Sequence, residues 1–399
     1  MEKIKVTKDI KKILDILNSH GKGYIVGGYI RDCLLGFEPK DCDFCTDIDY
    51  EKLKEIFKNY APKEIGKAFG IVQISFNGKK YEIAKLRKDI KFTAFRNKLE
   101  VEFIKDIGED LKRRDFTVNA IAFDGKRLIY SSELGKEDIK NRILRFVGEG
   151  KKRIEEDPLR VLRGIRIAGE KDLTILESTK QEILNGGKEI KRVAIERVQD
   201  EFFKMLKGKK SSESLYLLHS LGIFKELFPK TDKIIKCESI LEKLKKIDIS
   251  QNESLIIKLS IIFFKSQEEL DFLRLDNRSK KSILNIVQNL SSLSEISNRY
   301  EIKRLISKIG IDDFKNLLEI KELERNFSQV RDKFEEILNN NEPIFFKDLA
   351  ISGKDLLNIG VVNGVEIKTY LEKSLEIVLE NPKLNIKNYL INRIEEDKI

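Results

Sequence analysis

The chain has 399 residues, two to three times the usual size of a domain, so several modules with their own cores are expected. Lys and Arg number 77 against 67 Asp and Glu, and the net charge of +10 favours a polyanionic partner, with nucleic acid first among them. Hydrophobic residues make up 41% and charged residues 36%, which excludes wholesale disorder and a membrane-spanning protein.

The first half of the chain alternates glycine turns with short runs of β-forming residues. Gly27-Gly28 join a predicted strand to a predicted helix, and Asn77-Gly78 is a strong hairpin signal. Strands are predicted at residues 24–26, 41–45, 72–76, 80–84, 120–123 and 128–130, and helices at residues 29–35, 50–59 and 108–117. These elements indicate a mixed sheet of about five or six strands.

The second half of the chain is predicted to be helical. Only five of the 23 glycines lie at or beyond Gly222, and apolar residues there recur at helical spacing. A long helix is also predicted to start near Asp157, with Asp157 as its N-cap and Pro158 in its first turn. The fold class expected is therefore α+β, with a mixed-sheet head followed by an all-α remainder.

Two aspartates on the second predicted strand indicate a metal site. Asp41 and Asp43 are two residues apart, so both carboxylates project from the same face of a strand. Hard oxygen ligands suit Mg²⁺, which bridges phosphates and assists an attacking hydroxyl. An isolated Asp-x-Asp is common on exposed surfaces, so the residues around this pair decide its meaning.

Those surroundings resemble a phosphate cradle. Gly27 and Gly28 let a phosphate approach backbone N–H groups at the start of a helix, and Arg31 adds a guanidinium one turn later. Glu82 lies on the face of its strand opposite Tyr81 and Ile83, where it is either a third carboxylate facing the metal or a solvent-side glutamate.

The segment RRDFTVNA (113–120) brings cations, a carboxylate and an amide together before a strand. Either it is an exposed basic helix end, or Arg114 and Asp115 lie near ribose and phosphates with Asn119 ordering the turn.

The segment that starts at Glu156 places charged residues at offsets of three. Asp157, Arg160, Arg163 and Arg166 are expected along one helix face. One interpretation is an N-cap with a solvated basic stripe. The other is that a fixed acceptor beside a fixed donor complements the Watson–Crick edges of cytosine and adenine, and leaves guanine and uracil unpaired. Arg163 and Arg166 would then lean toward phosphates.

Cysteines and histidines are too few to build other kinds of site. The four cysteines do not make a disulfide scaffold, and Cys42 and Cys45 are expected to be incidental thiols. The two histidines, His20 and His219, exclude a histidine-rich metal centre. The N-terminus shows no export signal, so a cytoplasmic location is expected.

Taken together, these motifs resemble the class II tRNA nucleotidyltransferases, the bacterial CCA-adding enzymes and their poly(A) polymerase relatives. The matching segments, in the family's order, are GGYIRDCLLGFEPKDCDF (27–44), RRDFTVNA (113–120), EDPLRVLRGIR (156–166), ERVQDEFFKML (196–206), LHSLGIFKELFP (218–229) and KDLAISGKDLL (347–357). The resemblance implies a polymerase-β-like head at 1–145, a helical neck at 146–212, and a helical body and tail at 213–399.

The resemblance also implies roles for individual residues. Positions matching Asp41 and Asp43 hold the catalytic metals, taken to be Mg²⁺, with Glu82 as a less secure third carboxylate. Those matching Gly28, Arg31 and Arg114 contact the nucleotide, those matching Asp157 and Arg160 read the base, and those matching Arg163 and Arg166 help to bind the nucleotide. Residues 87–110 correspond to a loop that helps the pocket switch from C to A.

The activity implied is template-independent addition of CMP, CMP and AMP, from CTP and ATP, to the 3′ end of tRNA, whose acceptor arm is held by the body and tail. No HD phosphohydrolase signature occurs at residues 255–266, so no hydrolase activity is expected. Alternatives are A-adding only, CC-adding only, a poly(A) polymerase, or a catalytically silent RNA-binding protein.

Overall fold

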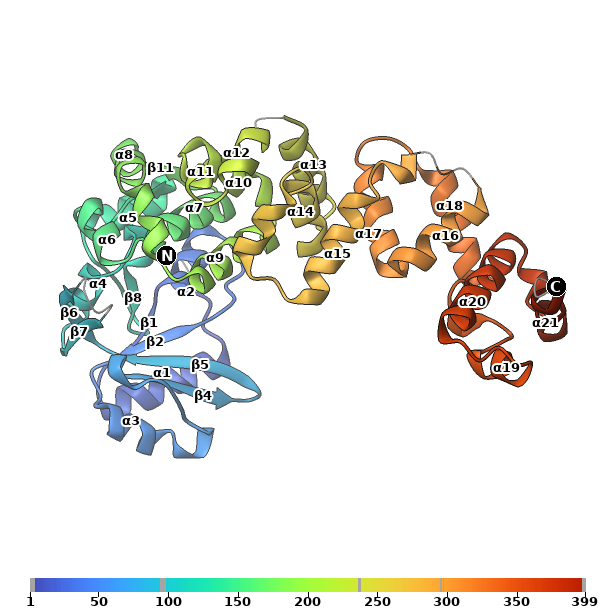
Figure 1. The fold of residues 1–399 in the computed structure, drawn as a ribbon. Helices are drawn as coiled ribbons and strands as arrows, with labels where there is room; N and C mark the ends of the chain where they lie inside the picture. The colour runs from blue at the N-terminus through green and yellow to red at the C-terminus, as the bar shows by residue number, and fades with distance from the viewer. Residues whose placement is uncertain (1–3, 94–97, 236–237, 295, 297, 397–399) are drawn as a thin grey trace. The chain divides into compact units, whose positions relative to one another are not determined.

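The computed structural model describes residues 4–93, 98–235, 238–294, 296 and 298–396. These residues form two units, Met1–Lys233 and Ile234–Ile399, with most contacts inside each unit. The boundaries predicted at 145/146 and 212/213 stay predictions. Figure 1 shows the sheet confined to the first unit and helices throughout the second.

The first unit is built on a seven-stranded sheet of order β3-β4-β5-β2-β1-β8-β9. The strands of this sheet are β1 (Gly23–Val26), β2 (Asp43–Thr46), β3 (Lys63–Gly66), β4 (Ile71–Phe76), β5 (Lys79–Lys85), β8 (Ile121–Phe123) and β9 (Leu128–Tyr130). The α+β class is confirmed. The prediction of five or six strands is wrong, because the sheet also contains the edge strand β3. This strand is short, and its one large apolar residue, Ile65, is exposed, so it lacks the apolar pattern of a strand.

Helices pack on both faces of this sheet because β1 and β2 are buried on both faces. Gly23 of β1 lies against Leu17 of α1 (Lys8–His20), where a Cβ would come within 2.5 Å of the leucine. On the opposite face, Tyr24 and Val26 belong to a buried cluster with Ile107 and Leu111 of α4 (Ile107–Lys112). The sheet is therefore held between α1 and α4.

Two predicted elements have different bounds in the structure. The second strand starts at Asp43 rather than residue 41, so Asp41 lies just before it. The helix predicted at residues 108–117 ends at Lys112, and a 3-10 turn follows at Thr117–Asn119. The hairpin at Asn77-Gly78 is confirmed; both residues have positive φ, 49° and 76°.

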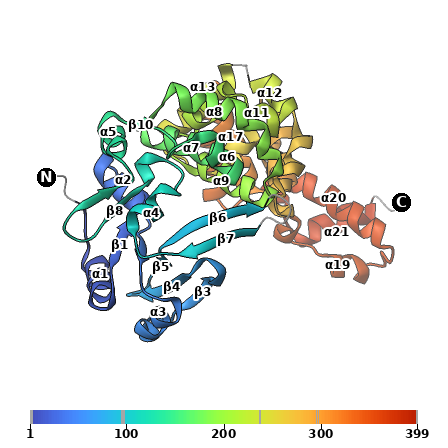
Figure 2. The ribbon, with the colours of Figure 1, turned by 90° about the vertical axis from the view of Figure 1, so that its left-hand side faces the viewer.

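A second, two-stranded ribbon lies outside the main sheet, as Figure 2 shows. It consists of β6 (Arg87–Thr93) and β7 (Lys98–Phe103), which pair antiparallel. It falls within the segment 87–110 that was expected to be a loop; residues 94–97 of that segment lie outside the described residues. Alternating charged residues on both strands hide its β character from a search for apolar runs.

The remainder of the first unit is almost entirely helical. Its helices are α2 (Gly28–Leu35), α3 (Tyr50–Ile56), α5 (Glu133–Asn141), α6 (Gly150–Glu156), α7 (Leu159–Lys171), α8 (Glu177–Gly186), α9 (Ile195–Lys207), α10 (Ser211–Ser220), α11 (Ile223–Leu227) and α12 (Pro229–Ile235). A short parallel pair joins β10 (Ile143–Leu144), at the end of the predicted head, to β11 (Thr174–Ile175), which interrupts the predicted all-α neck. Gly164 of α7 allows close packing on Phe116, since a Cβ there would lie 2.7 Å from the ring.

The second unit is all helical in its described residues. Its helices are α13 (Glu238–Ile249), α14 (Leu255–Ile262), α15 (Asn277–Gln288), α16 (Arg299–Ile309), α17 (Ile311–Glu322), α18 (Ser328–Asn339), α19 (Gly353–Asn358), α20 (Gly364–Glu380) and α21 (Lys387–Glu396). α14 is apolar on nearly all sides and buried, which suits a central helix of a bundle. The last helices, α19 to α21, share a small core of their own that includes Leu356, Val378 and Leu390.

Candidate active site

Two carboxylates lie side by side on the adjacent strands β2 and β5. β2 runs antiparallel to β1 and parallel to β5, and Asp43 is the register partner of Glu82 on β5. Both side chains lie on the face of the sheet that also carries the buried Val26 and Cys45, yet both residues are themselves exposed, while their neighbours Phe44 and Ile83 are buried on the other face. Asp41 is exposed and separated from Asp43 by the buried Cys42. The structure thus brings Asp43 and Glu82 together, with Asp41 near enough to act electrostatically on Asp43.

The charges around Asp43 and Glu82 favour the binding of a cation. Loss of water around Asp43 raises its pKa to about 6, and the negative charges of Glu82 and Asp41 act in the same direction while Arg114 opposes them. An excess of negative charge among oxygen donors fits a divalent cation, and Mg²⁺ typically takes one or two carboxylates and completes its shell with water and substrate phosphates. Within the described ranges, no three His, Cys, Asp or Glu side chains form a closed metal cluster.

The glycine turn before α2 brings backbone and guanidinium groups together. Gly27 has φ +74° and ψ −133°, a conformation suited only to glycine, and its N–H donates to the carbonyl of Ile121 at 3.0 Å. A Cβ on Gly27 would lie 3.3 Å from Nη1 of Arg114, and one on Gly28 would lie 3.5 Å from Nη2 of Arg31. The bare Gly27 therefore leaves room for Arg114, while a Cβ on Gly28 would be in ordinary contact with Arg31, so both guanidiniums lie beside the turn.

A chain of hydrogen bonds connects this turn to helix α7. Nη1 of Arg31 donates to Oδ1 of Asn119 at 2.7 Å, and Nδ2 of Asn119 donates to Oδ1 of Asp115 at 3.1 Å. Oδ2 of Asp115 then accepts from Nε and Nη2 of Arg163, at 3.0 and 2.9 Å. The predicted residues Arg31, Asn119, Asp115 and Arg163 are thus one connected set.

The same two helices are joined a second time. Asp32, next to Arg31, accepts from Arg31 through Oδ1 at 2.8 and 2.6 Å, and from Lys171 at the end of α7 through Oδ2 at 3.0 Å. Arg31 and Asp32 are both buried, so this pairing satisfies charges that would otherwise be costly.

Asp115 is held ionised by its partners. Burial alone would raise the pKa of Asp115, but the charge of Arg163 and the hydrogen bonds from Arg163, Asn119 and the Phe116 N–H outweigh it and lower the pKa to about 2. A fixed negative charge here orients Asn119, and through it Arg31.

Asp157 and Arg160 lie at the junction between α6 and α7. The N-cap of α7 is Pro158, one residue after the prediction, but Oδ1 of Asp157 still accepts from the Leu159 N–H at 3.3 Å. Oδ2 of Asp157 accepts from Nη2 of Arg197 at 2.9 Å. Arg160 instead donates to Glu156 at 2.7 Å and to the carbonyl of Arg113 at 3.2 Å. Acceptor and donor are therefore fixed separately, with Arg160 against the residue that precedes Arg114.

Arg166 has different ion-pair partners from the other predicted site residues. It forms ion pairs with Glu170 and with the buried Glu201 of α9, and with no predicted site residue in the described part of the chain. Its predicted contact with phosphates stays a prediction.

Asp110 of α4 is a buried carboxylate that the sequence reasoning did not single out. It has no exposed surface, and it accepts hydrogen bonds from both Arg113 and Arg114. Two adjacent arginines following an acid at offsets of three and four is the signal that could have found it.

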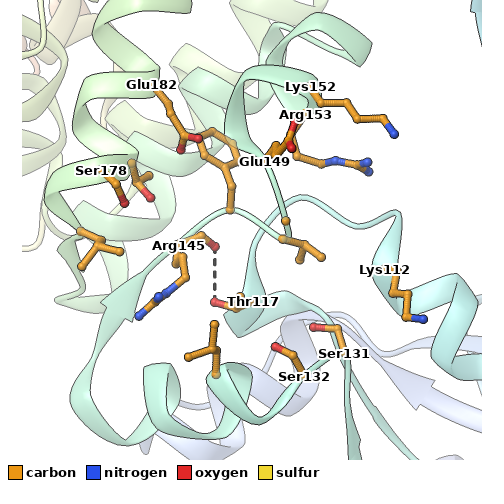
Figure 3. Close-up of a pocket in the computed structure, with 16 residues that line it drawn as sticks. Lys112, Thr117, Ser131, Ser132, Arg145, Glu149, Lys152, Arg153, Ser178 and Glu182 are labelled. Carbon is orange, nitrogen blue, oxygen red and sulfur yellow. Dashed lines mark hydrogen bonds between the residues drawn. The ribbon is translucent and has the colours of Figure 1, made fainter.

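A cavity lies between the end of α4, the β9–α5 connection and helices α6 and α8 (Figure 3). It measures about 620 Å³ and is lined by residues that include Lys112, Thr117, Ser131, Arg145, Lys152 and Arg153. None of the predicted site residues is among its lining residues.

Comparison with known proteins shows the family to which the chain belongs. The family model described as the poly A polymerase head domain matches residues 23–145, and the model described as a probable RNA and SrmB-binding site of polymerase A matches residues 172–235. A CCA-adding enzyme of Geobacillus sp. (strain WCH70) is 31% identical over 397 residues, which cover 96% of this chain and 96% of the relative. The chain belongs to the CCA-adding enzyme family.

Other members of the CCA-adding family match over the same span. The CCA-adding enzyme of Staphylococcus haemolyticus is 28% identical, with 97% of each chain covered. Among solved structures, the Bacillus stearothermophilus CCA-adding enzyme in complex with CTP matches with a TM-score of 0.83 at 24% identity, covering 98% of this chain and all of the other. The Thermotoga maritima CCA-adding enzyme complexed with tRNA matches with a TM-score of 0.67 at 21% identity over 99% of this chain and 97% of its own. The family fold thus extends over the whole chain. No helix in the described ranges is long and apolar enough to cross a membrane.

Proposed function

We propose that this protein adds CMP, CMP and AMP, taken from CTP and ATP, to the 3′ end of tRNA in the cytoplasm. The observation that carries the proposal is the end-to-end similarity to CCA-adding enzymes, together with the carboxylate pair beside the Gly27-Gly28 turn. The tRNA 3′-hydroxyl would attack the α-phosphate of the nucleotide and release pyrophosphate.

The carboxylates would hold the metal that this reaction needs. Asp41 and Asp43 would bind Mg²⁺, and Glu82 stands close enough to Asp43 to contribute. When bound, the ion lowers the pKa of the attacking hydroxyl and offsets the charge of the leaving group.

The glycine turn and its arginines would hold the triphosphate. The backbone N–H of Gly28 at the start of α2 and the guanidiniums of Arg31 and Arg114 would supply the donors, since a Cβ on Gly27 would lie 3.3 Å from Nη1 of Arg114 and one on Gly28 would lie 3.5 Å from Nη2 of Arg31. The chain from Asn119 through Asp115 to Arg163 would keep Arg31 in place while the nucleotide binds.

Base selection would use the hydrogen-bond acceptors of Asp157 and the hydrogen-bond donors of Arg160 that the fold itself does not use. Each oxygen of Asp157 accepts one hydrogen bond, so a lone pair stays free on both. Arg160 uses Nη1 for Glu156 and Arg153 and donates once through Nη2, and among the described residues its Nε donates to none. An acceptor beside a donor matches cytosine and adenine, whereas guanine or uracil would leave groups unpaired at about 1–3 kcal/mol each.

The experiment that tests this proposal is product sizing. Purified protein is incubated with tRNAs that end before the first C, after C and after CC, with labelled CTP or ATP and Mg²⁺. Addition of three, two and one nucleotides supports CCA addition. Products that stop after CC, products that start only from CC, or long A-tails would identify a CC-adding enzyme, an A-adding enzyme or a poly(A) polymerase. No labelling would favour a silent RNA-binding protein.

Binding of tRNA is expected to depend on salt. The net charge of +10 indicates that Lys and Arg contacts with phosphates dominate, and each contact adds to the slope of affinity against salt concentration. The helices of the second unit, Ile234–Ile399, would grip the acceptor arm, and deleting them should weaken tRNA binding more than CTP binding.

A further inference from the structure

Asp110 is a charged residue in a position where an isolated charge would be unstable. It lies on α4 with none of its surface exposed. A buried carboxylate stays in a fold when hydrogen bonds and opposite charges surround it. The partners of Asp110 therefore show what the residue does.

Asp110 accepts five hydrogen bonds from three residues. Oδ1 accepts from Nε and Nη2 of Arg113, at 3.0 and 2.8 Å, and from the backbone N–H of Arg87 at 3.2 Å. Oδ2 accepts from Nε and Nη2 of Arg114, at 3.3 and 3.1 Å. Each oxygen thus receives one guanidinium in a paired arrangement, which fixes both side chains in position and orientation.

The charge of Asp110 also keeps two neighbouring cations compatible. Burial alone would raise the pKa of Asp110, but the charges of Arg114 and Arg113 outweigh it and the pKa is lowered. An uncharged side chain at this position would leave two guanidiniums side by side with no counter-ion inside the cluster.

The three partners of Asp110 belong to different parts of the predicted site. Arg114 reaches the glycine turn, since its Nη1 would be 3.3 Å from a Cβ on Gly27, and it acts electrostatically on Asp43. The carbonyl of Arg113 accepts from Nη2 of Arg160 at 3.2 Å. Arg87 is the first residue of β6, so its N–H ties down the base of the β6–β7 ribbon.

We propose that Asp110 is a positioning residue that sets Arg114 over the glycine turn and joins it to Arg160 and to the base of the ribbon. The inference rests on the proposed function, because it assigns Arg114 to the bound nucleotide. Asp110 itself touches no substrate; it acts through the two arginines.

The test uses Asp110→Asn in the full-length protein. Glu109→Gln is the matched control, because Glu109 is the adjacent acid on α4 but pairs on the surface with Lys112 at 2.7 Å. CTP binding is measured by calorimetry, and KM and kcat are measured with a tRNA that lacks CCA. We expect Asp110→Asn to weaken CTP binding and raise KM about ten- to a hundredfold, with a much smaller change in kcat, and Glu109→Gln to match the wild type.

Coupling to Arg114 distinguishes positioning from general support. In an Arg114→Gln background, Asp110→Asn should change KM for CTP by less than about threefold, because the group it positions is gone. A full additive effect in that background would overturn the proposal, as would wild-type CTP binding in the single variant. Wild-type protein that transfers no CMP would instead overturn the proposed function.

A charge-matched variant covers the case in which Asp110→Asn fails to fold, judged by circular dichroism. Asp110→Asn with Arg113→Gln removes one negative and one positive charge together, so the cluster keeps its net charge. Compared with Arg113→Gln alone, the double variant should still show the rise in KM for CTP. Equal KM values in these two variants would overturn the proposal.

Discussion

Asp43 and Glu82 are register partners on adjacent parallel strands, and both residues are exposed on the same face of the sheet. Loss of water and the charge of Glu82 raise the pKa of Asp43 to about 6, so the protein without metal carries a repulsion that a divalent cation would relieve. The sheet register itself therefore prepares the proposed metal site.

The first prediction concerns these carboxylates. Asp41→Ala and Asp43→Asn should each abolish nucleotide transfer, because the proposed metal loses a ligand, while tRNA binding stays within about twofold of wild type. Transfer is followed by product sizing, and tRNA binding by filter retention.

Thermal unfolding supplies an independent readout for the same site. Mg²⁺ should raise the melting temperature of the wild-type protein, because ligands that bind only the folded state stabilise it, and the shift should vanish in Asp43→Asn. Retained turnover in either variant, or an unchanged shift, would contradict the metal role.

The second prediction compares two glycines at the two ends of α2. Gly27→Ala should raise KM for CTP at least tenfold, because its Cβ would lie 3.3 Å from Nη1 of Arg114 in a backbone conformation with φ +74°. Gly36→Ala is the control, since Gly36 also has positive φ, +83°, but its Cβ would meet nothing within 4 Å. Both variants should lose about 1–3 kcal/mol of stability, yet only Gly27→Ala should affect CTP. Equal KM values would argue against the cradle.

The third prediction concerns the stability of the first unit against acid. The pKa of Asp115 is lowered to about 2 from an ordinary value of 3.8, so its contribution to stability is complete above about pH 4 and is lost as the pH falls toward 2. At 1.36 kcal/mol per pKa unit, Asp115→Asn should cost roughly 2 kcal/mol at pH 7.

Calorimetric unfolding at pH 7, 4 and 2.5 checks this expectation. The difference between wild type and Asp115→Asn should shrink at the lowest pH. Asp172→Asn is the control, because Asp172 pairs with Lys210 at the surface and both side chains are substantially exposed. A difference that is the same at pH 2.5 and pH 7 would show that Asp115 does not stabilise the fold through its charge.

The fourth prediction concerns base selection. Arg160→Ala should reduce the preference for CTP over UTP about tenfold or more, because one of the two fixed groups that match cytosine is removed. Single-nucleotide incorporation from each of the four triphosphates measures the preference, and Arg192→Ala, an exposed arginine paired with Glu189, serves as control. An unchanged preference over UTP and GTP would assign base selection elsewhere.

The sequence predicted the parts of the fold that depend on local signals. The strand, glycine turn and helix around Gly27 are confirmed, as is the hairpin at Asn77-Gly78, because each rests on a backbone conformation that few residues adopt. The β6–β7 ribbon and β3 were not predicted, since their polar strands gain their structure from neighbours rather than from their own apolar pattern.

The sequence likewise predicted some features of the candidate site and missed others. The alternation of side chains along a strand was enough to place Glu82 on the face opposite Tyr81 and Ile83, but only the parallel register of β2 and β5 puts it beside Asp43. The role of Asp110 could not be predicted, because an acid in a charged segment normally faces solvent and its burial depends on where Arg113 and Arg114 fold back. Asp157 and Arg197 are 40 residues apart, so their pairing is likewise a product of how α7 and α9 pack.

The double connection between α2 and α7 has a consequence for exchanging parts among relatives. Arg31 reaches Arg163 through Asn119 and Asp115, and Asp32 reaches Lys171 directly. In a hybrid protein spliced near residue 145, Asp115 and Asp32 would come from one parent and the residues at positions 163 and 171 from the other. The foreign neck would therefore have to supply a cation at each of these two positions. Recombination or engineering that swaps catalytic heads should therefore succeed most often when the splice point falls after Lys171.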